Sequence, residues 1–102
     1  MAQFDVYRNP RRSTFPLLLD VQADLLGLLA SRIVVPMAPR KRYRARPITR
    51  LNPIGTVAGV EYVLVFQEMA AVPRGALGQP VASLAARRDA LVGAIDLMFA
   101  GI

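Results

Sequence analysis

The sequence predicts a small, mainly β domain that ends in one C-terminal helix. Four short stretches in the first two thirds of the chain have the residue pattern of β-strands. From about Val81 onward, apolar residues recur at helical spacing instead. The chain has 102 residues, close to the commonest domain size, and no repeat, low-complexity tract or change of composition divides it. Residues 1–102 are therefore expected to form a single domain.

The four predicted strands differ in how deeply they should be buried. They are QFDVYR at 3–8, LLLDVQ at 17–22, RIVVPM at 32–37 and EYVLVFQ at 61–67. In the first, Phe4 and Val6 share one face, as in a half-buried strand. Pro36 cannot donate a ladder hydrogen bond, so the third is expected at an edge or a bulge. The fourth is apolar on both faces, which favours the middle of a sheet, and Ala58-Gly59 before it favours a tight turn between strands.

The predicted helix carries two rows of side chains. Its core-facing row is an apolar stripe formed by Val81, Leu84, Leu91, Ile95, Met98 and Ile102. The far row is formed by Ala86, Ala90, Gly93 and Leu97. We expect Met98, Phe99 and Ile102 to hold the helix end against the sheet, with Ala100 and Gly101 facing outward. Such an end either presents a small shape to a partner or simply docks for stability.

Several classes of chemistry are excluded by composition. The chain has no cysteine and no histidine, which removes disulfides, thiol chemistry, Cys/His zinc sites and imidazole bases. Its seven carboxylates are scattered, and it has no Gly-rich phosphate loop. We therefore expect no enzymatic activity, no cofactor and no metal ion. The apolar stretch PLLLDVQADLLGLLA is interrupted by Asp20, Gln22 and Asp24, and no signal peptide is evident, so a cytoplasmic protein without membrane contact is expected.

Hydrophobic residues make up 54% of the chain, above the usual share for a domain of this size. Part of this excess is expected in an interface, so the sequence favours a homodimer. Charge is uneven as well, because residues 1–50 carry ten Lys/Arg against three Asp. The net charge of +6 is thus concentrated in the first half of the chain.

The densest positive segment is APRKRYRARPITR, which is too charged and too rich in flanking proline for a core element. Its cations are Arg40, Lys41, Arg42, Arg44 and Arg46, with Tyr43 among them. We interpret it as a surface loop, named here the basic loop (residues 40–46). It either contacts nucleic acid or an acidic protein segment, or is a solvated loop that keeps the protein soluble. Arg8, Arg11 and Arg12 form a smaller patch, interpreted as a solvated hairpin tip.

Five segments, in order, resemble the CcdB family of toxin–antitoxin toxins. They are QFDVY, LDVQADLL, RIVVPMA, MAAVP and the closing AIDLMFAGI, and together they span essentially the whole chain. The resemblance implies a small twisted antiparallel sheet, related to SH3-like barrels and to the MazF toxins, with a C-terminal helix packed on it. It also implies a homodimer.

The resemblance further implies a function. CcdB-like toxins bind the A subunit of DNA gyrase and trap the enzyme on cleaved DNA, and a CcdA-like antitoxin neutralises them. Toxin and antitoxin together repress their operon, with operator DNA bound only through the antitoxin. The gyrase contact of the family is a final Trp-Gly-Ile, which matches Ala100, Gly101 and Ile102 here.

Ala100 departs from that pattern, because the family has tryptophan there. The chain is then either a weak or non-toxic homologue, or a binder of gyrase or another target through a re-tuned surface. The basic loop is also more basic than the family pattern, which indicates either a more acidic antitoxin segment or closer contact with DNA. For the antitoxin we expect a salt-sensitive contact between this loop and an acidic segment. A MazF-like ribonuclease toxin is the alternative from a different class, with the basic loop as its support.

Overall fold

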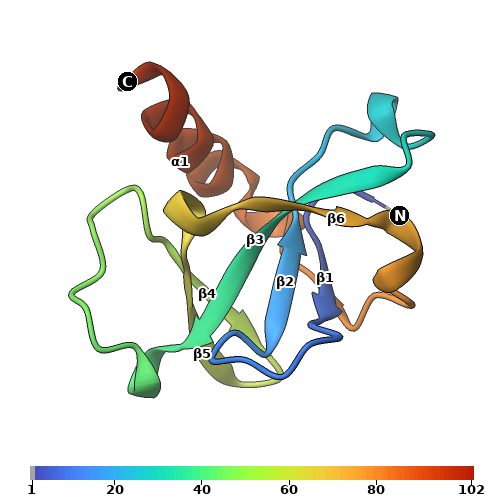
Figure 1. The fold of residues 1–102 in the computed structure, drawn as a ribbon. Helices are drawn as coiled ribbons and strands as arrows, with labels where there is room; N and C mark the ends of the chain where they lie inside the picture. The colour runs from blue at the N-terminus through green and yellow to red at the C-terminus, as the bar shows by residue number, and fades with distance from the viewer. Residues whose placement is uncertain (1) are drawn as a thin grey trace.

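The computed structural model describes residues 2–102, which form a curled antiparallel sheet with one helix packed across it (Figure 1). This mainly β architecture with a nearly closed, barrel-like sheet confirms the predicted fold class. The strands are β1 (Asp5–Arg8), β2 (Leu17–Asp20), β3 (Ser31–Pro39), β4 (Ile54–Val57), β5 (Val60–Leu64), β6 (Ala70–Pro73) and β7 (Ala82–Ser83), and the helix is α1 (Arg88–Ala100). The sheet order is β4-β5-β3-β2-β1-β7, and β6 also pairs with β3.

β3 is the central strand, so the prediction of an edge position for the segment around Pro36 is wrong. One side of β3 pairs with β2, while the other pairs with β6 over residues 31–34 and with β5 over residues 37–39. Pro36 falls between those two ladders, and its carbonyl accepts a hydrogen bond from the Val65 N–H at 3.0 Å. The nitrogen of a strand residue points to the same side as its carbonyl. The missing N–H therefore lies at a gap in the pairing, where a central strand tolerates proline.

β4 and β5 form the hairpin expected from Ala58-Gly59. Both residues have positive φ, 51° for Ala58 and 79° for Gly59. Two positive φ values are the signature of a type I′ turn, whose twist matches that of the flanking strands. β5 has a neighbour on each side, as expected for an interior strand.

α1 begins at Arg88, so the prediction of a helix from Val81 is wrong at its start. The backbone of the preceding segment bonds to β1 instead: the Val81 N–H donates to the Val6 carbonyl at 2.7 Å, and the Leu84 N–H to the Phe4 carbonyl at 2.8 Å. These bonds satisfy backbone carbonyls along the outer edge of β1, which would otherwise be unpaired. Leu84 is still buried, but as an anchor ahead of the helix.

The core has two parts, on the two faces of the sheet. The larger lies between the sheet and α1, where Leu91 and Ala94 are fully buried. The smaller lies on the outer face, where Tyr7, Leu18, Val34 and Leu77 meet. Within residues 2–102, no helix has the length and apolar character needed to cross a membrane.

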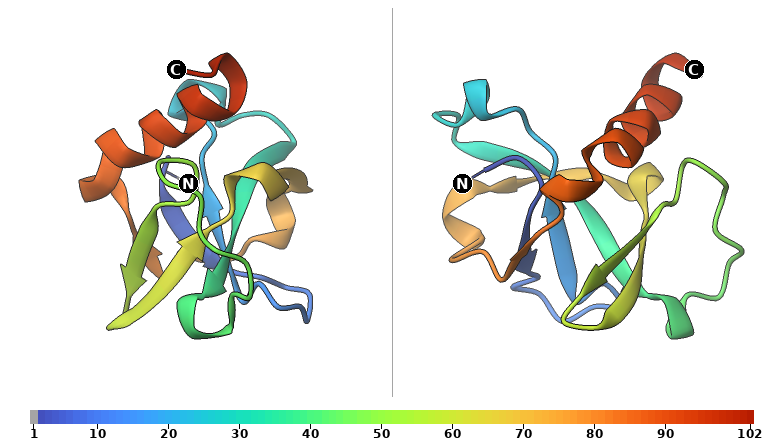
Figure 2. Two further views of the ribbon diagram at one scale, coloured as in Figure 1. Left: turned by 90° about the vertical axis from the view of Figure 1, so that its left-hand side faces the viewer. Right: turned by 180° about the vertical axis from the view of Figure 1, so that it is seen from behind.

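Both Figure 1 and Figure 2 show the connections of the barrel sorted to two ends. One end carries the last turn of α1 and the segment between β2 and β3. The opposite end carries the β1–β2 connection, the 3-10 turn Arg40–Arg42 and the β4–β5 turn. These two ends differ in chemistry.

Candidate functional site

The last turn of α1 projects beyond the sheet. Gly101 ends the helix in the left-handed conformation, with φ 74°, and its N–H donates to the Asp96 and Leu97 carbonyls at 3.1 Å. This closure is a C-cap that glycine supports without steric cost. Ala100, Gly101 and Ile102 are all exposed. The three residues therefore form an ordered, accessible tip.

Met98, Phe99 and Ile102 do not anchor the helix end on the sheet, contrary to the prediction. Phe99 is 71% exposed and Ile102 72% exposed, and Met98 is exposed as well. The fully buried contacts of α1 are made by Leu91 and Ala94, in its first half, and the final turn extends past the sheet surface that would cover it. The apolar stripe belongs partly to the core and partly to an open face.

Arg50 holds the tip from a distant part of the sequence. Its Nη2 donates to the main-chain oxygen of Ile102 at 2.5 Å. Arg50 also adopts a positive φ of 71°, which non-glycine residues rarely do. Together with Pro53 it lines a shallow groove against Asp89, Ala90 and Gly93, two of which belong to the small row on α1. No sequence signal pointed to Arg50; its separation of 52 residues from Ile102 hid the contact.

A wide apolar groove lies beside the tip. It has a volume of about 600 Å³ and is lined by residues of the β2–β3 segment, β6 and α1, among them Leu26, Leu29, Met69, Ile95 and Phe99. The segment between β2 and β3 also exposes Leu25 (93%) and Leu28 (95%). Exposed apolar surface on this scale is typical of a protein interface. We call it the apolar groove; its position was not predicted.

The basic loop lies on the surface, as expected. Arg40–Arg42 form a 3-10 turn directly after β3, and the five cations of the loop are exposed, with Tyr43 half-buried. Arg40 is paired with Glu61 at 3.3 Å, with both side chains about half exposed. The end of the following connection is fixed by buried Asn52, which donates to the Leu64 carbonyl and to Gln67 Oε1. The connection thus runs from the basic loop to Arg50 and the tip.

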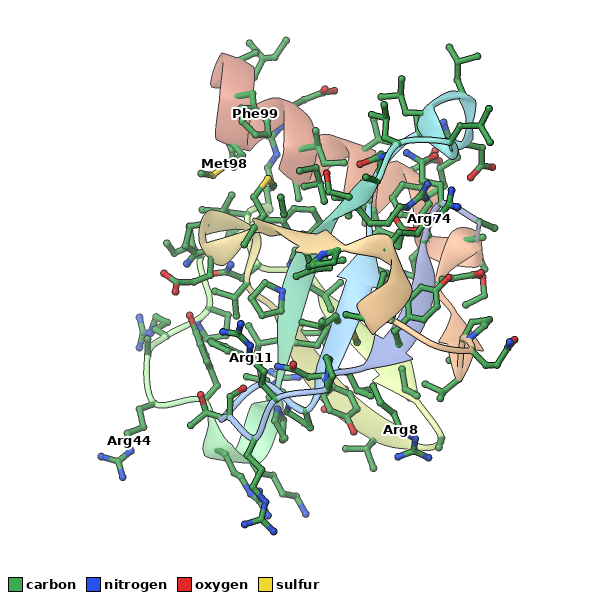
Figure 3. The ribbon with its side chains drawn as sticks, turned by 45° about the vertical axis from the view of Figure 1, so that its right-hand side comes forward. Arg8, Arg11, Arg44, Arg74, Met98 and Phe99 are labelled. Atoms are coloured by element: carbon green, nitrogen blue, oxygen red, sulfur yellow. The ribbon has the colours of Figure 1, made fainter. Side chains whose placement is uncertain are left out.

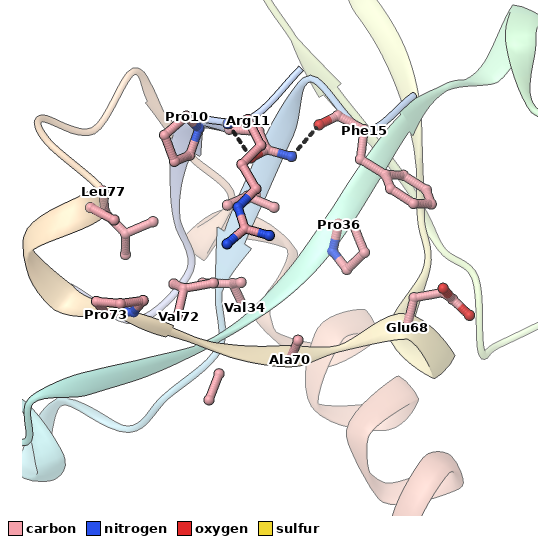
Figure 4. A pocket seen from close by; sticks show the side chains of 14 residues that line it. Pro10, Arg11, Phe15, Val34, Pro36, Glu68, Ala70, Val72, Pro73 and Leu77 are labelled. Atoms are coloured by element: carbon pink, nitrogen blue, oxygen red, sulfur yellow. Dashed lines mark hydrogen bonds between the residues drawn. The ribbon is translucent and has the colours of Figure 1, made fainter. Parts of the chain in front are cut away.

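Figure 4 shows a second groove, on the outer face of the sheet. Its volume is about 440 Å³, and it lies between the β1–β2 connection and β6. Asn9 shapes the connection by accepting from the Arg11 N–H at 3.0 Å and donating to the Phe15 carbonyl at 2.8 Å. Arg11 reaches toward Val34 and Val72 in this view. Arg8, Arg11 and Arg12 are all exposed, in agreement with the predicted solvated patch, and Arg11 in addition lines this groove.

Asp20 and Arg32 form a fully buried ion pair that supports the β2–β3 ladder. Asp20 Oδ2 accepts from Arg32 Nε at 2.9 Å and from Nη2 at 2.6 Å. Burial raises the pKa of Asp20 above its usual value, and the hydrogen bond from Arg32 opposes that rise. Because both groups are sealed from solvent, the pair is structural. Among residues 2–102 no cluster of three or more metal-binding side chains occurs.

The sequence of the chain matches the model of a protein family. Residues 3–101 match the model of the family described as CcdB protein. The chain belongs to the CcdB family. CcdB proteins are toxins of toxin–antitoxin systems, of the gyrase-poison kind, and they act without catalysis of their own. Membership implies an antitoxin partner and a gyrase target in general terms, and it confirms the family expected from the five sequence segments.

Proposed function

We propose that this CcdB protein binds the A subunit of DNA gyrase through Ala100, Gly101 and Ile102 and traps the gyrase–DNA cleavage complex. The observation that carries the proposal is the ordered tip: a capped helix end whose last three residues are exposed and which is held by Arg50. Pre-ordering matters because a mobile segment would lose conformational entropy on binding. The tip is compact enough to enter a cavity of a partner.

Ala100 limits the strength of this contact. A methyl group has neither the stacking area of an indole nor its cation–π attraction, so we expect weaker binding than a tryptophan-bearing tip would give. We therefore propose a toxin of modest potency. A CcdA-like antitoxin is proposed to neutralise it and to supply the sequence-reading part of an operator complex.

We also propose a homodimer. It is supported by the apolar groove, which exposes more large apolar side chains than an isolated small domain usually does. A second copy seated on this groove would cover Leu29, Met69 and Phe99. The dimer would then display two tips at one end of the assembly.

The proposed function is tested with purified gyrase and supercoiled DNA. The full chain should increase the linear DNA recovered after denaturing the enzyme, and a chain lacking Gly101 and Ile102 should not. Binding to the isolated A subunit, measured by calorimetry, should be lost with the same deletion. If the full chain gives neither cleaved DNA nor binding, gyrase is not the target. RNA incubated in parallel tests the ribonuclease alternative through site-specific cuts.

A further inference from the structure

Two positive segments, far apart in the sequence, meet at the end of the molecule opposite the tip. The β1–β2 connection and the 3-10 turn after β3 lie together there in both Figure 1 and Figure 2. A groove of about 750 Å³ joins them, lined by Pro16 from the first segment and Arg40, Lys41 and Arg42 from the second. We call the six cations that lie in or close to these two segments and at this end the basic end: Arg8, Arg12, Arg40, Lys41, Arg42 and Arg44. Arg11 is not one of them, because its side chain lies over the groove on the outer face of the sheet.

The basic end accounts for most of the net charge of the protein. Outside it and its ion-paired Glu61, the chain has seven arginines and six carboxylates, which nearly balance. No ion pair joins the other five cations of the basic end to a carboxylate within the described part of the chain. Figure 3 shows Arg8 and Arg44 reaching outward from this end. The result is a strong, uncompensated positive field on one pole of the molecule.

We propose that the basic end binds the phosphate backbone of duplex DNA without reading its sequence. Five of the six cations are arginines, whose planar forks suit phosphate oxygens. A duplex presents one negative charge per about 1.7 Å of its axis, so a surface with cations on several elements neutralises several phosphates at once. This activity goes beyond the proposed function, in which the antitoxin alone contacts the operator.

An acidic protein segment is the competing occupant, and the distribution of apolar side chains argues against it. Protein segments gain much of their affinity from apolar anchors in a contact surface. Most exposed large apolar side chains belong to the β2–β3 segment and the end of α1, whereas Val60 is the one next to the groove of the basic end. The structure thus separates an apolar pole for protein partners from a cationic pole for a polyanion.

The test is fluorescence anisotropy of a labelled duplex of arbitrary sequence, titrated with the full chain between about 50 and 200 mM salt. Binding should weaken steeply with salt, with a slope of log K against log[salt] of about −0.9 for each phosphate contact. Arg42→Gln and Arg44→Gln remove exposed cations whose side chains form no hydrogen bond or ion pair within residues 2–102. Each should reduce affinity and make the slope shallower by about 0.9.

Arg74→Gln is the control, because it removes the same charge outside the basic end (Figure 3). Unlike Arg42 and Arg44, Arg74 also donates a hydrogen bond to the Gly27 carbonyl at 2.6 Å, so the fold of this variant is checked by circular dichroism. The variant should leave affinity and slope nearly unchanged. Equal weakening by the control, or no binding at the lowest salt, would overturn the proposal. So would tighter binding to poly-glutamate than to the duplex, which would assign this end to an acidic protein segment. Gyrase takes no part in the assay, so its outcome is independent of the proposed toxin function.

Discussion

Position 100 sets the contact area that the tip offers. An added indole would be exposed, because Ala100 faces solvent, so Ala100→Trp should leave the fold intact. It should tighten binding to the gyrase A subunit by about 0.5–2 kcal/mol, roughly 2- to 30-fold, through stacking on a cation of the target. Calorimetry measures the change, and Ala86→Trp, at an exposed position ahead of α1, is the control. Unchanged affinity in Ala100→Trp would place the contact elsewhere.

The buried pair Asp20–Arg32 is the residue-scale feature on which stability depends most. Asp20→Asn leaves the Arg32 charge buried without its carboxylate, which should lower the free energy of unfolding by about 3–5 kcal/mol. Urea denaturation measures the loss. Asp96→Asn, at an exposed carboxylate, should change it by no more than about 0.5 kcal/mol.

A second variant separates the ion pair from simple loss of packing. Replacing both partners, with Asp20→Leu and Arg32→Met together, leaves no unpaired charge. The double variant should therefore be less destabilised than Asp20→Asn alone. If the double variant is the less stable of the two, the pair contributes favourable energy beyond charge compensation.

The β4–β5 hairpin is an element that carries avoidable strain. Ala58 has a positive φ of 51°, a conformation that costs a non-glycine residue about 1–2 kcal/mol and that asparagine tolerates better. Ala58→Asn creates the preferred Asn-Gly turn and should raise stability by about 0.5–1 kcal/mol in urea denaturation. Thr56→Asn, on the exposed face of β4, should not. A destabilised Ala58→Asn would show that the turn is held by contacts of the Ala58 methyl group.

The connection from the basic loop to β4 should act as a brace for the helix end. Alanine at position 50 would adopt the same unfavourable positive φ as Arg50. Arg50→Ala therefore removes the hydrogen bond to Ile102 without changing the backbone strain. Affinity for the gyrase A subunit should fall by about 0.5–1.5 kcal/mol, the net value of one hydrogen bond, with little change in thermal stability. Calorimetry measures the affinity. An unchanged affinity in Arg50→Ala would mean that the hydrogen bond to Ile102 does not help to position the tip.

The elements show which parts of the fold were predictable. The alternation around Val6 and the turn residues Ala58-Gly59 are local signals, and the elements they predicted were found. The predictions for Pro36 and Val81 were wrong because both depend on distant strands. Pro36 lies at a gap between β5 and β6, and Val81 pairs with the open edge of β1. Ala100 and Gly101 were placed correctly as exposed, whereas Ile102 was wrongly expected to pack against the sheet. Arg50 and the apolar groove arise only when distant segments meet, so no short stretch of sequence could predict them.

At the scale of the whole molecule, the barrel keeps two kinds of surface apart. The tip and the apolar groove share one pole, and the basic end occupies the other. Partners that need apolar contact and partners that need positive charge would therefore not compete for the same surface. A toxin that is dimerised at one pole would still expose the cations of both copies at the other.

This arrangement predicts how the oligomer responds to a charge at the apolar pole. Phe99 lines the apolar groove and is largely exposed in the single chain, so Phe99→Asp should not unfold the protein. A carboxylate buried at the centre of an interface would lack a partner, and its desolvation should shift the dimer to monomer at micromolar concentration. Light scattering coupled to gel filtration measures the mass. Val60→Asp, an exposed apolar position at the other pole, should leave the dimer intact. A monomeric unmodified chain would contradict the homodimer. A dimer that resists Phe99→Asp but not Val60→Asp would move the interface away from the apolar groove.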